Sequence, residues 1–135
     1  MKFFEWKDAY SINNKIIDGQ HSKLLEIINN VYVSAYETED AKRANIEKAL
    51  VELVDYVEYH FRTEEDLMKQ HNYREYSLHR KAHYIFLKRT MKFNKANLDN
   101  LDALRHDMLD FLKDWLIRHI LSMDKEFGLF LKAEK

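Results

Sequence analysis

The chain has 135 residues, which is enough for one domain with its own hydrophobic core and too few for two. Its 22 basic residues nearly balance its 23 acidic ones, and no block of five or six like charges occurs, so we expect no nucleic-acid partner. Cysteine is absent, so histidine and carboxylate side chains must supply any metal-binding chemistry. We therefore expect a single domain over residues 1–135.

The first 16 residues include four aromatic side chains, Phe3, Phe4, Trp6 and Tyr10. This composition predicts an arm over residues 1–16 that packs on the outside of the domain. The segment has no uninterrupted apolar core, and no stretch in the chain approaches the roughly 18 apolar residues of a membrane span. We expect no membrane insertion and a cytoplasmic location.

Long helices follow the arm, because the chain has no proline and only two glycines. Apolar residues recur every three or four positions in four stretches, which predict helices at roughly 18–37, 41–70, 75–94 and 99–132. Asp18 fits the first helix as an N-cap or as an acid of the first turn. Four amphipathic segments with short polar connections predict an all-α fold, an antiparallel up-down-up-down four-helix bundle with an N-terminal arm.

Each predicted helix places at least one histidine on its apolar stripe. These residues are His21, His60, His79, His83 and His119. One such histidine alone is more often a hydrogen-bonded core residue. Five together favour a metal site, because a buried imidazole is costly without partners and facing helices can direct several imidazoles at one ion.

The spacing of these residues favours two metals. His60 and Glu64, like His79 and His83, are four residues apart, which places them about 40° apart on one helix face. His119 and Asp124 are five apart, so this pair requires a local π-bulge or a carboxylate that reaches a second ion. Since a carboxylate can bridge two metals, five histidines and two acids suit a two-metal cluster better than a single zinc.

Other polar residues fit the surface. Glu65 and Asp66 are rotated off the face of Glu64 and are expected to be solvated charges, and His71 and His106 lie outside the converging set. The apolar residues around His119 have two readings that can both hold, ordinary core or the dry wall of a small-molecule pocket. They are Trp115, Leu116, Ile120 and Leu121. The Glu-x-x-His pair of ferritin-like di-iron enzymes is absent from the sequence.

The motifs that carry these ligands resemble the hemerythrin family, in particular its single-domain bacterial members. The similarity runs over almost the whole chain, from Trp6 through Ile17-Asp18-Gly19-Gln20-His21, His60-Phe61-Arg62-Thr63-Glu64-Glu65-Asp66-Leu67-Met68, Tyr73, His79 and His83 to Trp115-Leu116-Ile117-Arg118-His119-Ile120 and Asp124.

The resemblance implies a di-iron cofactor and a division of the ligands between its ions. One iron would be held by His79, His83 and His119, and the other by His21 and His60. The two irons would be bridged by Glu64, Asp124 and a solvent-derived oxo or hydroxo group. One position would stay open on the second iron for dioxygen, with Trp115, Leu116, Ile120 and Leu121 expected to line the oxygen side.

The implied function is reversible dioxygen binding for transport, storage or scavenging, by a binding protein rather than an enzyme. Two alternatives stay open. One is a di-iron redox enzyme that acts on nitric oxide or peroxide, and the other is a sensor module that responds to oxygen or iron. An unidentified protein partner or reductase is compatible with each.

Overall fold

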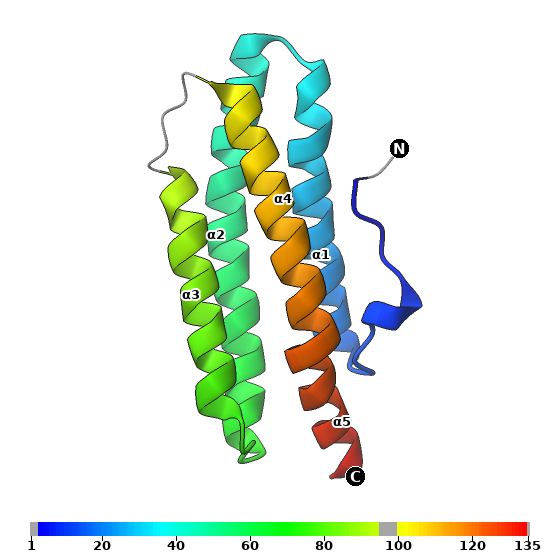
Figure 1. Cartoon of the computed structure of the whole chain (residues 1–135). Helices are drawn as coiled ribbons and strands as arrows, with labels where there is room; N and C mark the ends of the chain where they lie inside the picture. Colours follow the sequence, from blue (N-terminus) through cyan, green and yellow to red (C-terminus); the bar gives the residue numbers. More distant parts are fainter. Residues whose placement is uncertain (1–2, 95–99, 135) are drawn as a thin grey trace.

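The computed structural model describes residues 3–94 and 100–134, and these form an antiparallel bundle of four long helices. The helices run up, down, up and down in chain order (Figure 1). Their bounds are α1 Lys15–Val33, α2 Glu39–Gln70, α3 Tyr76–Asn94 and α4 Leu101–His119. The predicted fold class is confirmed.

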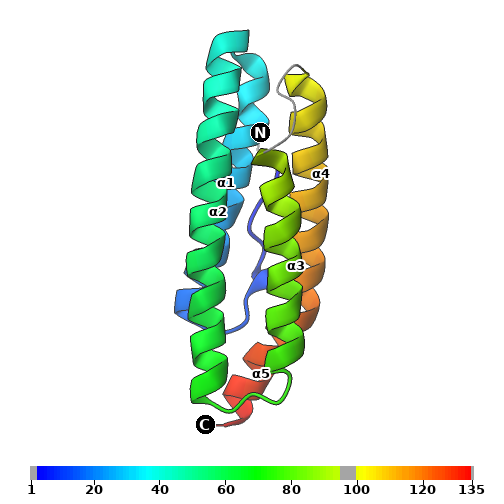
Figure 2. The ribbon, with the colours of Figure 1, turned by 90° about the vertical axis from the view of Figure 1, so that its left-hand side faces the viewer.

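Shorter elements extend the bundle. The arm contains a 3-10 turn, η1 (Asp8–Tyr10), and a second turn, η2 (Ser34–Tyr36), follows α1. After α4 comes a π-helical segment, η3 (Ile120–Asp124), and then α5 (Lys125–Ala133) continues toward the C-terminus at the lower end of the bundle (Figure 2). The stretch expected as one helix over 99–132 is therefore three consecutive elements, and residue 99 lies outside the described residues.

The first helix begins three residues before the expected position. The side chain of Asn14 is the N-cap and accepts hydrogen bonds from the backbone N–H groups of Ile16 and Ile17, each at 3.1 Å. Asp18 is an acid of the first turn, and its carboxylate accepts from the Ser11 hydroxyl at 2.5 Å and from the Ile12 N–H at 2.9 Å. These bonds tie the arm to α1.

The arm lies along the outside of the bundle beside α1 (Figure 1). Asn29 of α1 pairs with the backbone of Phe4, donating to its carbonyl at 2.7 Å and accepting from its N–H at 2.8 Å. Lys113 of α4 donates to the carbonyl of Phe3 at 3.1 Å and lies over the Phe3 ring. The arm therefore covers the seam between the first and last long helices.

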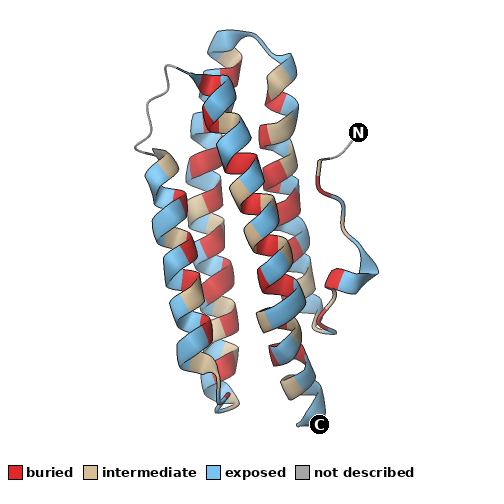
Figure 3. Ribbon diagram, in the orientation of Figure 1, coloured by how far each residue is buried: buried red, intermediate tan, exposed pale blue. Residues whose placement is uncertain are grey.

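Buried residues occur along the whole length of the bundle (Figure 3). A main apolar cluster fills the upper and middle parts, and a smaller one closes the lower end with Ile12, Ile17, Met68, Tyr73 and Phe127. The histidine-bearing level lies between these two apolar layers. None of the described helices is long and apolar enough to cross a membrane.

Candidate metal centre

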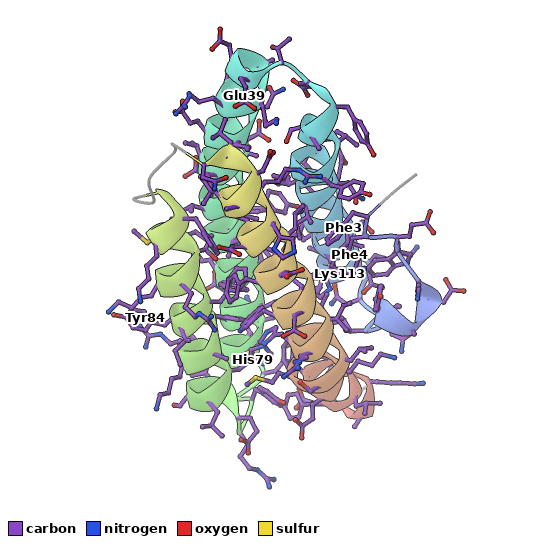
Figure 4. All side chains as sticks on the ribbon, turned by 45° about the horizontal axis from the view of Figure 1, so that its top comes forward. Phe3, Phe4, Glu39, His79, Tyr84 and Lys113 are labelled. Carbon is purple, nitrogen blue, oxygen red and sulfur yellow. The ribbon has the colours of Figure 1, made fainter. Side chains whose placement is uncertain are left out.

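All seven expected ligands lie together inside the bundle. α1 contributes His21, α2 contributes His60 and Glu64, α3 contributes His79 and His83, α4 contributes His119, and η3 ends with Asp124. None of them is more than 5% exposed. Figure 4 shows His79 directed from α3 toward the neighbouring helices. Four helices and the π-helical segment thus bring nitrogen and oxygen donors to one buried level.

One group of donors consists of His79, His83, His119 and Asp124, whose potential ligand atoms lie within 4.8 Å of one another. Nε2 of His119 is 3.1 Å from Nε2 of His79 and 3.2 Å from Nε2 of His83. Oδ1 of Asp124 is 2.8 Å from Nε2 of His79 and 3.0 Å from that of His119. Three imidazole nitrogens and one carboxylate oxygen therefore converge on one point.

The second group consists of His21, His60, Glu64 and again Asp124. Nε2 of His60 is 2.6 Å from Oε1 of Glu64, and Nε2 of His21 is 3.0 Å from Oδ2 of Asp124. Asp124 directs one oxygen to each group. Glu64 also lies between the groups, since its Oε2 is 3.7 Å from Nε2 of His79. The arrangement is two adjacent sites with two carboxylates between them.

Several polar atoms of the centre have no partner that a protein interior normally provides. Among the described residues, both ring nitrogens of His21, both carboxyl oxygens of Glu64 and Oδ2 of Asp124 are buried without a hydrogen bond. Burying such groups unpaired is costly, and cations satisfy imidazole and carboxylate donors together. Imidazole and carboxylate are suitable ligands for iron. The donor set therefore fits a pair of metal ions.

The environment keeps the imidazoles in their ligand form. Burial lowers the pKa of His60, His79 and His83 below that of an ordinary histidine, so these rings are neutral near pH 7. Burial and the neighbouring Asp124 raise the pKa of Glu64 well above its ordinary value. Burial also opposes ionisation of Asp124, but the nearby imidazoles of His119, His21 and His79 hold its pKa well below the usual range. Metal binding at this centre therefore competes with protons.

The π-helical segment explains how His119 and Asp124 share a site although they are five residues apart. A π-helix forms hydrogen bonds from residue i to i+5, so its members five apart lie on one face. Residues 120–124 adopt this conformation, and within them only Ile120 and Asp124 are buried. Of the two solutions that the sequence allowed for this spacing, the local π-bulge is present, and Asp124 also reaches the second group.

Two polar residues support the imidazoles from behind. The carbonyl oxygen of Gln20 is 2.7 Å from Nδ1 of His60, and its amide nitrogen donates to the hydroxyl of Thr63 at 3.2 Å. Because a carbonyl oxygen only accepts, Nδ1 of His60 carries the proton and Nε2 presents its lone pair to the centre. Oε2 of Glu65 is 2.9 Å from Nδ1 of His83 and orients that ring in the same way.

The position of Glu65 corrects the expectation that it is a solvated charge. Its side chain is only 20% exposed and burial raises its pKa, whereas Asp66 is exposed as expected. Rotation away from Glu64 on α2 directs Glu65 toward α3 rather than toward solvent. Sequence spacing within one helix gives no information about this neighbour, and the same holds for Gln20, which contacts a helix 40 residues further along the chain.

The apolar surroundings agree only in part with the expected oxygen pocket. Leu116 and Ile120 are buried, and the ring of Trp115 stacks on His119 with centroids 4.3 Å apart. Leu121 is 44% exposed, which does not fit the expected pocket role, because its position in η3 directs it away from the buried face. Phe61 is not among the residues expected to line the pocket, but its ring stacks on that of His83 with centroids 3.7 Å apart.

The two remaining histidines lie away from the centre. His106 is 72% exposed on α4, and His71 pairs with Glu134 at 2.7 Å near the lower end of the bundle. Neither contributes to the two donor groups.

Comparisons with known proteins show which family and which relatives the chain resembles. A family model described as the hemerythrin HHE cation binding domain matches residues 13–130. A bacteriohemerythrin of Clostridium acetobutylicum is 36% identical over 126 residues, which cover 92% of this chain and 98% of the relative. A bacteriohemerythrin of Stenotrophomonas maltophilia is 31% identical over 136 residues, covering 98% of this chain and 84% of the relative.

Solved structures show the same similarity. A crystal structure of wild-type hemerythrin superposes with a TM-score of 0.77 at 26% identity, covering 93% of this chain and 95% of the other. A hemerythrin mutant in which a leucine is replaced by tyrosine superposes with a TM-score of 0.81 at 27% identity, covering 95% and 96%.

Proposed function

This chain belongs to the hemerythrin HHE cation binding family, and we propose that the seven buried donors hold the two irons of a centre that binds dioxygen reversibly. The observation that carries the ligand assignment is the pair of adjacent donor groups that share Asp124. His79, His83 and His119 hold one iron, His21 and His60 hold the other, and the two carboxylates join them. The relatives support oxygen binding at a non-haem di-iron site as the function.

When bound, the two irons supply an open coordination position and the electrons that dioxygen binding requires. The group with His21 and His60 contains two imidazoles, whereas the other contains three, and this difference supports an open position on the iron that His21 and His60 would hold. The protein's own contribution is to keep His60, His79 and His83 neutral, to orient His60 and His83 through Gln20 and Glu65, and to hold the carboxylates between the ions.

Reversibility depends on excluding water and stray protons from the centre. Leu116 and Ile120 are close to His119 in the sequence and are buried. The rings of Phe61 and Trp115 stack on His83 and His119. We propose that these side chains form the dry wall of the site. Leu121 is not part of it, because nearly half of its side chain is exposed.

The protein is proposed to carry, store or scavenge oxygen rather than to catalyse a reaction. The rings that stack on His83 and His119 belong to Phe61 and Trp115, which cannot act as the proton donor that turnover of peroxide or nitric oxide requires. A redox enzyme that acts on nitric oxide or peroxide would instead consume its substrate in repeated cycles.

Optical spectroscopy tests the function. The iron-loaded, anaerobically reduced protein is exposed to air, and the oxygen is then removed under argon. A nearly colourless protein that gains absorption in air and loses it on deoxygenation over several cycles supports oxygen binding. Irreversible conversion to an Fe(III) form in the first cycle contradicts it, and steady consumption of nitric oxide or peroxide with a reductant supports the enzyme instead.

A further inference from the structure

The outer face of α3 has a charge unlike that of the chain as a whole. The chain carries a formal net charge of −1, but the segment Tyr76–Asn94 contains no acidic residue. It contains five basic residues, Arg80, Lys81, Lys88, Arg89 and Lys92. All five are exposed, so this one helix presents a concentrated positive field to the solvent.

Apolar side chains are exposed among these cations. Leu78, Tyr84, Ile85 and Met91 are between 45% and 61% exposed. A hollow of about 340 Å³ is lined by Ile85, Lys88, Arg89, Met91 and Lys92, and a second of about 290 Å³ is lined by Ser77, Arg80, Lys81 and Tyr84. Both hollows lie entirely on α3. The face thus combines cationic groups with apolar contact area, as protein interfaces do.

The same helix carries two of the proposed iron ligands on its inner face. His79 and His83 point into the bundle, whereas Tyr84 points away from it on the opposite side of α3 (Figure 4). A helix with its side chains is about 10–12 Å across, so a molecule on the outer face lies roughly 10 Å from the imidazoles. Tyr84 directly follows His83 in the chain, which provides a short covalent connection between the two faces.

We propose that the outer face of α3 is the docking surface for a small acidic protein that carries single electrons and reduces the di-iron centre. The electron-transfer part of this proposal rests on the proposed function. Each encounter passes one electron from the reduced carrier to an Fe(III) ion, which becomes Fe(II), so two encounters restore an oxidised centre to its reduced state.

The size of the patch favours a transient carrier over a second copy of the chain. Lys92 lies fourteen positions after Leu78, which corresponds to roughly 20 Å of helix. A strip of this length and one helix width covers a few hundred Å², below the roughly 800 Å² per partner of a stable interface and in the range of weak redox encounters. Attraction between opposite charges speeds such encounters.

A membrane surface is a poorer match for this face. Helices that lie in a lipid interface bury a continuous apolar face. The continuous apolar face of α3 is its inner one, where Phe86 is fully buried in the bundle. The outer apolar residues alternate with cations, which suits a partner that offers carboxylates and apolar contacts together.

The test uses the iron-loaded, oxidised protein with a purified acidic flavodoxin as the probe and basic cytochrome c as the probe of opposite charge. Calorimetry at low salt measures binding, and stopped-flow absorption measures reduction by flavodoxin hydroquinone. The triple variant K81E/K88E/K92E reverses the charge of the face. The matched control K15E/K23E/K48E makes the same change in net charge at exposed lysines of α1 and α2. The variant K81Q/K88Q/K92Q removes the three charges without reversing them, and it provides a second test if K81E/K88E/K92E does not fold.

We expect wild-type protein to bind flavodoxin and not cytochrome c, and its affinity to weaken with salt. Charge reversal on α3 should lower affinity and second-order reduction rate by about tenfold or more, and neutralisation should lower them by less, with the control unchanged. Equal losses in K81E/K88E/K92E and in the control K15E/K23E/K48E, no binding of flavodoxin, stronger binding to phosphatidylserine vesicles, or self-association through α3 would each overturn the proposal.

The two proposals fail separately in this design. Binding of flavodoxin that depends on the α3 lysines, in a protein whose absorption does not respond reversibly to oxygen, contradicts the oxygen function and leaves the docking surface standing. If K81E/K88E/K92E binds oxygen reversibly like the wild type, and if its affinity for flavodoxin and its reduction rate are also those of the wild type, only the docking surface is overturned.

Discussion

Acidification of the metal-free protein is expected to destabilise it because the centre buries neutral histidines. Burial lowers the pKa of His60, His79 and His83 in the folded chain. In the unfolded chain these histidines bind protons as the pH falls through about 6.5. The unfolded state therefore takes up as many as three protons that the folded state does not bind as readily, and stability is lost as the pH falls below this value.

Glu64 opposes this effect. Its folded pKa is raised well above 4.5, so above that pH the folded state holds a proton that the unfolded state has released. Stability from this group falls as the pH rises. Asp124 has a lowered pKa, so it stabilises the folded state above about pH 3.8, and this stabilisation is constant between pH 5 and 6. The net difference is about two protons, which gives a slope of about 2–3 kcal/mol per pH unit near pH 5.5.

Urea unfolding of metal-free protein at about pH 6.5 and about pH 5.5 measures this slope. The free energy of unfolding should fall by about 2 kcal/mol, a large part of the 5–15 kcal/mol typical of a domain. A double variant, His71→Gln with His106→Gln, removes the two histidines outside the centre and should keep the slope. Stability that is constant, or that increases on acidification, would refute the reasoning.

Three further predictions concern packing and the support of the ligands. Gly128→Ala places a Cβ 2.6 Å from a backbone oxygen of the arm and should lower the free energy of unfolding by about 1–3 kcal/mol. Gly19→Ala, whose Cβ has nothing within 4 Å, should raise it by about 0.5–1 kcal/mol, and thermal unfolding measures both changes. Gln20→Leu removes the acceptor of a buried imidazole N–H and should weaken iron affinity by about 10–100-fold in chelator competition, with recovery in Gln20→Glu; unchanged affinity would argue against the supporting role. Leu116→Ala should cost about 2–5 kcal/mol and speed autoxidation, whereas Leu121→Ala should change stability by less than about 0.5 kcal/mol and leave autoxidation as it is; the reverse order would show that the wall is misplaced.

The fold could be predicted from the sequence because each helix repeats its apolar residues at one period and the breaking residues are nearly absent. The residues at which the helices begin and end were less predictable. Asn14 and Asp18 both suit an N-terminal turn, and the capping geometry, which spacing does not reveal, assigns the cap to Asn14. The irregular spacing of His119 and Asp124 left two possibilities, a π-bulge or a carboxylate that reaches a second ion, and spacing alone could not decide between them.

The ligand candidates could be read from the sequence because polar residues stood out on apolar stripes. The residues around them could not. Gln20 and Glu65 act across helix contacts, and their partners depend on how neighbouring helices are rotated about their axes. Leu121 is apolar and adjacent to buried Ile120, yet it lies two positions after His119, about 200° around a helix, and is exposed. An apolar side chain next to a ligand in the sequence therefore need not face the site.

The most direct test of the ligand assignment is the number of irons bound per chain in three proteins. The wild type and Asp110→Ala, which changes an exposed acid of α4, should each bind two. Asp124→Ala removes the residue that belongs to both donor groups and should bind one iron or fewer. Two irons in Asp124→Ala, or a single iron in the wild type, would contradict a centre built from two adjacent sites that share this carboxylate.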